Sequence, residues 1–135
     1  MSKELAFEVK LAIPYDQALE KVAAALKTEG FGILTRIDVR ATLKEKIGAE
    51  FRPYAILGAC NPPLAHRALS RDGQAGLVLP CNITVESTGD TSSLVRIADP
   101  DVFLRVGGFE ADEVLLGIAA DARARLLRAA AALAV

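Results

Sequence analysis

Two cysteine-asparagine pairs are the residues of this 135-residue chain best suited to chemistry. Cys60 is followed by Asn61, and Cys81 stands between Pro80 and Asn82. A thiol can act as a nucleophile or a soft metal ligand, and a carboxamide both donates and accepts hydrogen bonds. Proline lacks an N–H group, so it interrupts backbone pairing and opens a local gap. These five residues therefore form the predicted ligand-binding site.

The two thiols are expected to differ in reactivity. Cys60 comes just before Asn61, the expected N-cap of a helix whose positive end favours a thiolate. Cys81 is predicted to share a buried strand face with four apolar residues, where a thiol has a raised pKa and is inert: Leu77, Leu79, Ile83 and Val85. One hypothesis is accordingly a thiol redox protein in which Cys60 attacks and Cys81 resolves.

Metal binding is a further alternative that the sequence leaves open. The single histidine, His66, lies on the same expected helix as the Asn61 cap. Tetrahedral zinc takes four nitrogen or sulfur ligands, and the chain offers three, Cys60, Cys81 and His66, unless a second chain adds more. No CxxC pair, GxSxG motif or glycine-rich phosphate loop is present. We therefore assign no catalytic residue and no cofactor, and the sequence favours a protein that is not an enzyme.

Composition excludes several partners. The 16 basic and 17 acidic residues nearly cancel, so the chain lacks the positive charge that phosphate backbones require, and we expect no nucleic-acid binding. The apolar run at residues 126–135 contains Arg128 and is too short to span a bilayer, so we expect no membrane partner. The first ten residues alternate and carry acids, unlike a secretory signal, and the two cysteines fit a reducing compartment. These features predict a cytoplasmic protein.

Hydrophobic periodicity predicts the elements that position the cysteines. Strands are expected at residues 7–13, 31–37, 54–60, 77–86 and 94–98. The second of these is apolar on both sides near its start, which predicts a central place in the sheet. If the helix between the third and fourth strands is a crossover, these two strands are parallel neighbours and bring the two thiols close together.

Period-four spacing predicts the helices. A first helix starts at Tyr15, another follows residue 61, and the longest covers residues 111–134, while Asp99-Pro100 predicts a brief helical turn. A short helix near residue 40 has two candidate caps, Asp38, or Thr42 together with Glu45. The result is one domain over residues 1–135, an α+β fold with about five strands in a mixed sheet and about four helices.

A family resemblance accompanies these patterns. Residues 29–39, 42–46, 56–62 and 77–82 closely resemble, in the same order, the bacterial and archaeal domain-of-unknown-function family 302. The resemblance covers nearly the whole chain. It implies a small two-layer α+β fold, one domain per chain and a homodimer, and it implies no established activity.

Three functions remain open at this point. The working hypothesis is a dimeric module that binds or senses a small ligand or ion near Cys60, Asn61, Pro80, Cys81 and Asn82. The second is the thiol redox protein described above. The third is a structural or accessory subunit that acts through its dimer surface.

Overall fold

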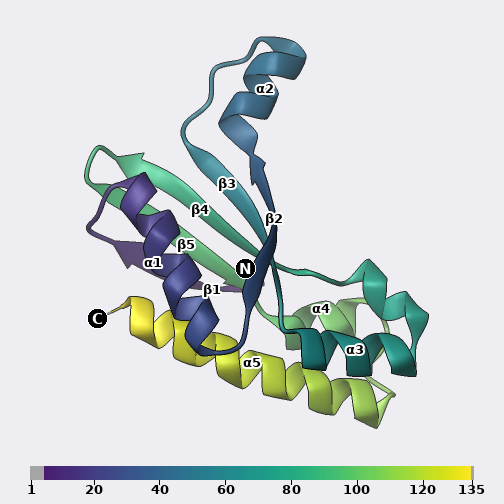
Figure 1. Cartoon of the computed structure of the whole chain (residues 1–135). Helices are drawn as coiled ribbons and strands as arrows, with labels where there is room; N and C mark the ends of the chain where they lie inside the picture. The colour runs from purple at the N-terminus through teal and green to yellow at the C-terminus, as the bar shows by residue number, and fades with distance from the viewer. Residues whose placement is uncertain (1–4, 135) are drawn as a thin grey trace.

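Five antiparallel strands form one sheet in the order β1-β5-β4-β3-β2 in the computed structural model, which describes residues 5–134. The strands are β1 (Ala6–Leu11), β2 (Gly32–Asp38), β3 (Tyr54–Cys60), β4 (Cys81–Gly89) and β5 (Ser92–Ala98). The helices are α1 (Tyr15–Thr28), α2 (Val39–Ile47), α3 (Pro62–Arg71), α4 (Pro100–Val106) and α5 (Glu113–Leu133), with a 3-10 helix η1 (Gly73–Leu77). This is an α+β fold with a long C-terminal helix, as predicted (Figure 1).

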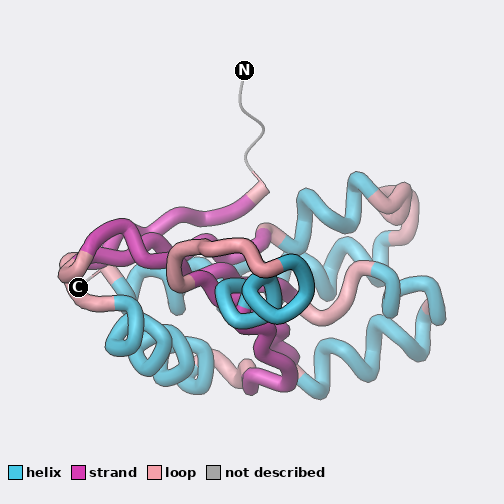
Figure 2. Tube along the Cα trace, turned by 90° about the horizontal axis from the view of Figure 1, so that it is seen from above, coloured by secondary structure: helices cyan, strands magenta, loops and turns pink. Residues whose placement is uncertain are grey.

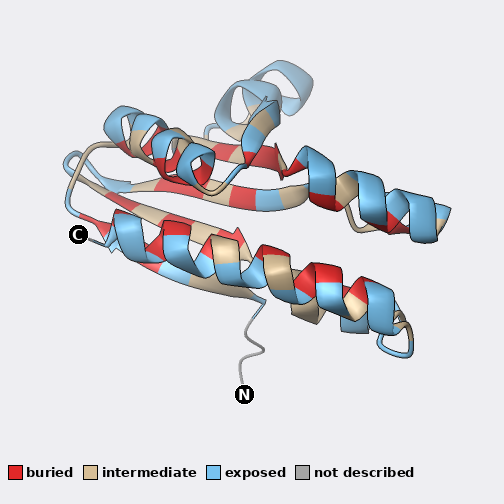
Figure 3. Ribbon diagram, turned by 60° about the horizontal axis from the view of Figure 1, so that its bottom comes forward, coloured by how far each residue is buried: buried red, intermediate tan, exposed pale blue. Residues whose placement is uncertain are grey.

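The core lies between one face of the sheet and helices α1 and α5. Cross-strand partners from β4 and β5 fill its centre: Ile83 pairs with Ile97, and Val85 with Val95, all fully buried. Burying one such side chain contributes about 1.5–3 kcal/mol, so this apolar layer holds the helices on the sheet. Figure 3 shows the buried residues as bands on the sides of the helices and strands that face one another.

The prediction of a mixed sheet is wrong, because every strand pair is antiparallel. β3 and β4 are neighbours as expected, but residues 61–80 do not cross the face of the sheet. Helices α3 and η1 instead lie beyond the end of the sheet and return the chain to the end it left (Figure 1). A connection that returns to the same end makes the next strand antiparallel.

The second strand is also misplaced by the sequence pattern. β2 is an edge strand and is largely exposed, although its apolar start predicted a central position. The register shifts between Ile33 and Thr35, so Leu34 is the extra residue of a β-bulge. The bulge explains why Ile33 and Leu34 are both apolar although only one face of the sheet is covered here. It turns the Leu34 side chain outward, where it is 67% exposed.

Local signals placed the other elements with small errors. β4 starts at Cys81 rather than residue 77, because residues 73–77 form η1. The turn predicted at Asp99-Pro100 is the full helix α4, so residues 5–134 contain five α-helices rather than about four. Asp38 is the cap of α2, since its side chain accepts a hydrogen bond from the Ala41 N–H.

Helix α2 projects away from the sheet (Figure 1). Seen from above, α3, α4 and the start of α5 gather beyond one end of the strands (Figure 2). No residue of α2 is buried within the described chain. The molecule thus has two features outside its core, the β2–α2 arm (residues 32–47) and the helical end that contains residues 61–80.

Candidate functional site

A cavity of about 550 Å³ lies beyond the end of the sheet, with α3 and η1 on one side and α4 and α5 on the other. Small-molecule sites are typically clefts of roughly 300–1,000 Å³. All the residues predicted to bind a ligand line this cavity: Cys60, Asn61, Pro80, Cys81 and Asn82. The fold thereby brings together the two segments that the sequence singled out, although the connection between them differs from the predicted crossover.

The walls of the cavity are almost entirely apolar. Alanines on three helices, among them Ala65, Ala68 and Ala119, leave the space open because their side chains are short. Leu64, Leu104 and Leu115 are buried and form the deeper wall. Within residues 5–134, no charged side chain lines this space. The cavity is therefore suited to an apolar molecule.

Cys81 and Cys60 border the cavity in different ways. Cys81 on β4 pairs with Ala59 on β3, and Cys60 is the next residue after Ala59. Because side chains alternate along a strand, the two thiols point to opposite faces of the sheet. Both are free cysteines and do not lie at disulfide distance. Burial, together with the nearby Cys60, raises the pKa of Cys81 to about 11. Cys81 is accordingly a protonated, weakly nucleophilic thiol at neutral pH.

The side chain of Asn61 is occupied by structural hydrogen bonds. Its Oδ1 accepts a hydrogen bond from the Leu64 N–H at 3.2 Å, which caps α3, and its Nδ2 donates to the Glu29 carbonyl at 3.5 Å. Gly30 has φ +83° and lies against this amide, where an added Cβ would stand 2.9 Å from Nδ2. Asn61 therefore positions α3 and the cavity wall rather than offering its amide to a ligand.

Asn82 differs from Asn61, because it is exposed and has no side-chain hydrogen bond within residues 5–134. It pairs with Gly58 on β3, and Gly58 pairs in turn with Thr35 on β2. A Cβ on Gly58 would lie 2.3 Å from the Thr35 hydroxyl oxygen and 2.8 Å from the Pro80 ring. The glycine thus lets Thr35 and Pro80 pack directly over the backbone beside Asn82.

Sequence reasoning missed the residues that complete this cavity. Nothing in the sequence pattern singles out Thr35, which lines the cavity. Gly58 does not line the cavity, but it lets Thr35 and Pro80 pack there, and a glycine inside a strand often marks such a close approach. The wall formed by Pro100, Phe103 and Leu104 of α4 was missed as well, because nothing local in the sequence predicts that this helix folds back beside α3.

Comparison with known proteins identifies the family. Residues 7–133 match the family described as "Domain of unknown function DUF302". The chain belongs to the DUF302 family. It is similar to the crystal structure of an uncharacterized conserved DUF302 protein from Bacillus stearothermophilus, with 30% sequence identity and a TM-score of 0.83 over 97% of this chain and 99% of that one. No curated protein matches the chain.

The candidate metal ligands of this DUF302 chain are not brought together. His66 is exposed on α3 and lines a separate groove of about 640 Å³ between α3 and α5 rather than the cavity. Within the part of the chain that the structure describes, no three His, Cys, Asp or Glu side chains form a group able to hold a metal ion. The set Cys60, Cys81 and His66 is therefore not a metal centre in this structure.

Within residues 5–134, both arginines that line the groove beside His66 are paired with aspartates. Arg71 forms an ion pair with Asp112 at 2.9 Å, and Arg67 approaches Asp121 at 3.6 Å. These arginines are already paired at the surface, so the groove offers little to an anion.

Among residues 5–134 of this DUF302 protein, no helix has both the length and the apolar character needed to cross a membrane.

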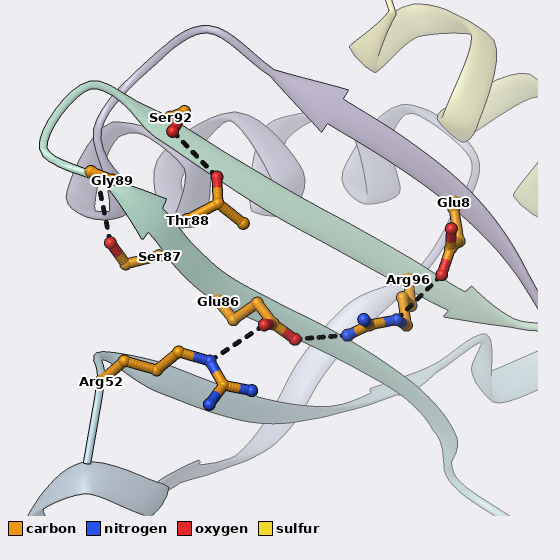
Figure 4. Close-up of polar contacts among 8 residues, drawn as sticks. All are labelled: Glu8, Arg52, Glu86, Ser87, Thr88, Gly89, Ser92 and Arg96. Carbon is orange, nitrogen blue, oxygen red and sulfur yellow. Dashed lines mark hydrogen bonds and ion pairs between the residues drawn. The ribbon is translucent and has the colours of Figure 1, made fainter. Parts of the chain in front are cut away.

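A row of ion pairs crosses the sheet on the face opposite the core (Figure 4). Arg96 on β5 bonds to Glu86 on β4 and donates to Glu8 on β1 at 3.0 Å, and Arg52 donates to Glu86 at 3.0 Å. Burial opposes ionisation of Glu86, but the bonds and charges of Arg96 and Arg52 outweigh it and lower its pKa. This face of the sheet is polar, and its charged side chains pair with one another, in contrast to the apolar cavity.

Proposed function

We propose that this DUF302 protein is a binding or sensing module whose small ligand occupies the cavity beside the two cysteine-asparagine segments. The observation that supports the proposal is an apolar space of about 550 Å³ lined by Cys60, Pro80, Cys81 and Asn82. Sites of this size with a few convergent polar groups are where small molecules bind in most proteins. A thiol redox function is less favoured, because Cys81 is protonated at neutral pH and is not at bonding distance from Cys60.

A neutral fluorescent probe tests the proposal directly. N-phenyl-1-naphthylamine gains fluorescence in apolar surroundings, and we expect it to bind the wild-type protein saturably. Ala65→Phe introduces a ring at the cavity wall and is expected to weaken probe binding at least tenfold. Ala24→Phe, at an exposed position on α1 outside the cavity, is the matched control and should leave binding unchanged.

Two further results decide the interpretation. Ala119→Leu fills the opposite wall on α5 and should also weaken binding, which protects the test against misfolding of one variant. Circular dichroism and thermal melting of all three variants establish that they fold. If folded Ala65→Phe and Ala119→Leu bind the probe as tightly as wild type, or if wild type does not bind it, the proposed function is wrong.

We also propose that the module acts as a homodimer through the β2–α2 arm. Helix α2 has nine residues and none is buried, and helices shorter than about 12–15 residues are marginal in water on their own. Ile37 and Ile47 on the arm are 48% and 73% exposed. Antiparallel pairing of two β2 strands about Ile37 would set Arg36 of each copy opposite Asp38 of the other, a favourable cross-strand charge pair. A second copy of the chain therefore fits this edge.

Sedimentation velocity tests the dimer. Wild type should sediment as a dimer, and Ile37→Lys should shift it to a monomer, because two lysines would then face each other across the pairing axis. Leu127→Lys replaces an exposed leucine on α5, away from the arm, and should remain dimeric. A wild-type monomer, or a dimer unaffected by Ile37→Lys, contradicts this interface. If dimers form while the cavity binds no probe, the accessory-subunit hypothesis replaces the binding module.

A further inference from the structure

The chemistry of the cavity narrows the class of ligand that it can hold. Within residues 5–134 its lining contains no aspartate, glutamate, lysine, arginine or histidine. An ionised group placed there would lose its hydration without gaining a partner, which is strongly unfavourable. A ligand of this site is therefore uncharged in the part that the cavity encloses.

Two polar side chains of the cavity, Thr35 and Asn82, come from the strands on either side of β3. Thr35, Gly58 and Asn82 are consecutive cross-strand partners on β2, β3 and β4, so the hydroxyl and the amide stand on the same face. Gly58 lies between them, and its missing side chain leaves room for the Thr35 hydroxyl and the Pro80 ring. Hydroxyl and carboxamide groups each donate and accept hydrogen bonds. They match a neutral polar group, such as an alcohol or an amide, at this end of the ligand.

The opening of the cavity is bounded by apolar side chains that solvent reaches. Leu77 and Leu34 are 82% and 67% exposed, and Leu69 and Phe103 are exposed to a smaller extent. All four line the cavity. Four of the ten large exposed apolar side chains of residues 5–134 thus gather at one opening, an arrangement that marks a binding surface rather than scattered surface residues.

We infer that the ligand is an uncharged amphiphile, an apolar chain that carries a hydroxyl or carboxamide head. The chain lies between α3–η1 and α4–α5 under Leu34, Leu69, Leu77 and Phe103, and the head bonds to Asn82 and Thr35. This inference rests on the proposed function and specifies its ligand class. Neither thiol is required to react, because binding depends on shape, burial and hydrogen bonds.

A series of matched amphiphiles tests the inference by titration calorimetry. Primary alkanamides, 1-alkanols, carboxylates and alkylammonium ions of equal chain length are titrated into the wild-type protein at neutral pH. We expect amides and alcohols to bind at least tenfold more tightly than both ions. Each added methylene should lower Kd about three- to fourfold until the cavity is filled, since burying one CH₂ is favourable by a fixed increment.

A variant of the head site and the fluorescent probe complete the test. Asn82→Leu, which keeps the size of the side chain but removes its hydrogen bonds, should weaken amide binding about two- to tenfold. It should leave binding of N-phenyl-1-naphthylamine nearly unchanged, which shows that the variant is folded. If the probe binds but carboxylates or ammonium ions bind as tightly as amides, or chain length has no effect, the ligand class is wrong and the binding module remains. If nothing binds, the proposed function fails as well.

Discussion

The ion-paired face of the sheet and the cavity at its end use polar residues in opposite ways. On the face, Glu86 is only 6% exposed, and Arg52 and Arg96 satisfy both of its carboxylate oxygens. At the cavity, the Asn82 amide has no partner within residues 5–134 and stands beside an apolar space of about 550 Å³. A polar group whose bonds are complete supports the fold, whereas an unpaired polar group beside an open apolar space is available to a ligand.

The comparison also separates residues that resemble each other in sequence. Asn61 and Asn82 each follow a cysteine, but Asn61 belongs with the paired groups because it caps α3 and contacts the Glu29 carbonyl. Only Asn82 keeps its amide free. Whether each amide is hydrogen-bonded depends on the groups that surround it in the folded protein. Substitutions at the paired face and at the cavity are therefore expected to affect stability and ligand binding differently.

The largest expected effect concerns Cys81. Its pKa of about 11, against 9.0 for an ordinary thiol, lowers the thiolate fraction at pH 8 about hundredfold. Iodoacetamide should therefore modify Cys81 about two orders of magnitude more slowly than an ordinary thiol, and Cys60 should be labelled first. Mass spectrometry of tryptic peptides over time measures both rates, with Cys60→Ser and Cys81→Ser as controls. Equal labelling of the two cysteines at pH 8 would contradict the raised pKa of Cys81.

Replacing Glu86 tests the paired face. Glu86→Gln removes the charge that both arginines bind, and we expect a loss of about 1–3 kcal/mol in the free energy of unfolding. Asn82→Ala on the same strand should change it by less than about 0.5 kcal/mol, because that amide completes no internal bond. Urea denaturation of the two variants measures the difference. A larger loss for Asn82→Ala than for Glu86→Gln would reverse the contrast between the regions.

The pH dependence of stability should follow from the same residue. Because the folded protein lowers the pKa of Glu86 below its ordinary value of 4.5, the unfolded chain binds its proton first as the pH falls. The stabilisation is thus complete above pH 4.5 and is lost as the pH falls through the lowered value. The stability gap between wild type and Glu86→Gln should narrow over that range and stay constant from pH 6 to 8. A gap that widens on acidification would contradict the ion pairing.

The smallest expected effect lies at the opening of the cavity. Leu77→Ser removes an apolar side chain that is already 82% exposed, so stability should change by less than about 0.5 kcal/mol. Binding of N-phenyl-1-naphthylamine should nevertheless weaken a few-fold, because Leu77 lines the site. Val106→Ser, at a similarly exposed residue outside the cavity, is the control. Unchanged probe binding by Leu77→Ser would place the ligand elsewhere.

Local sequence signals sufficed for most elements of this fold. The alternation around Ile83 and Ile97, the Asp38 cap and the Pro100 helix start all depend on residues close together in the chain, and the structure has a strand or helix at each. Local patterns also selected Cys60 and Cys81, which do line one cavity. Proline and cysteine are distinctive enough to mark such a place without knowledge of the fold.

The errors concern long-range arrangement. Strand direction depends on where residues 61–80 return the chain, and a helix between two strands is compatible with a crossover or with a return to the same end. The edge position of β2 was not predicted, because the bulge at Leu34 places two apolar residues in succession, a pattern typical of a strand covered on both faces. Thr35 reaches the site only because β2 pairs with β3 in a register that sets it opposite Gly58. Such contacts depend on register, which one sequence does not specify.

The most direct test of the account is the position of a bound amphiphile. Nuclear Overhauser effects between 1-decanol and the methyl-labelled alanines of the wild-type protein locate the chain at atomic resolution. We predict cross-peaks from the alkyl chain to Ala68 and Ala119, and from the carbon next to the hydroxyl to the Asn82 side-chain amide. Binding without cross-peaks to these groups, or with cross-peaks only to alanines on the outer face of α1 or α5, would show that the cavity is not the ligand site.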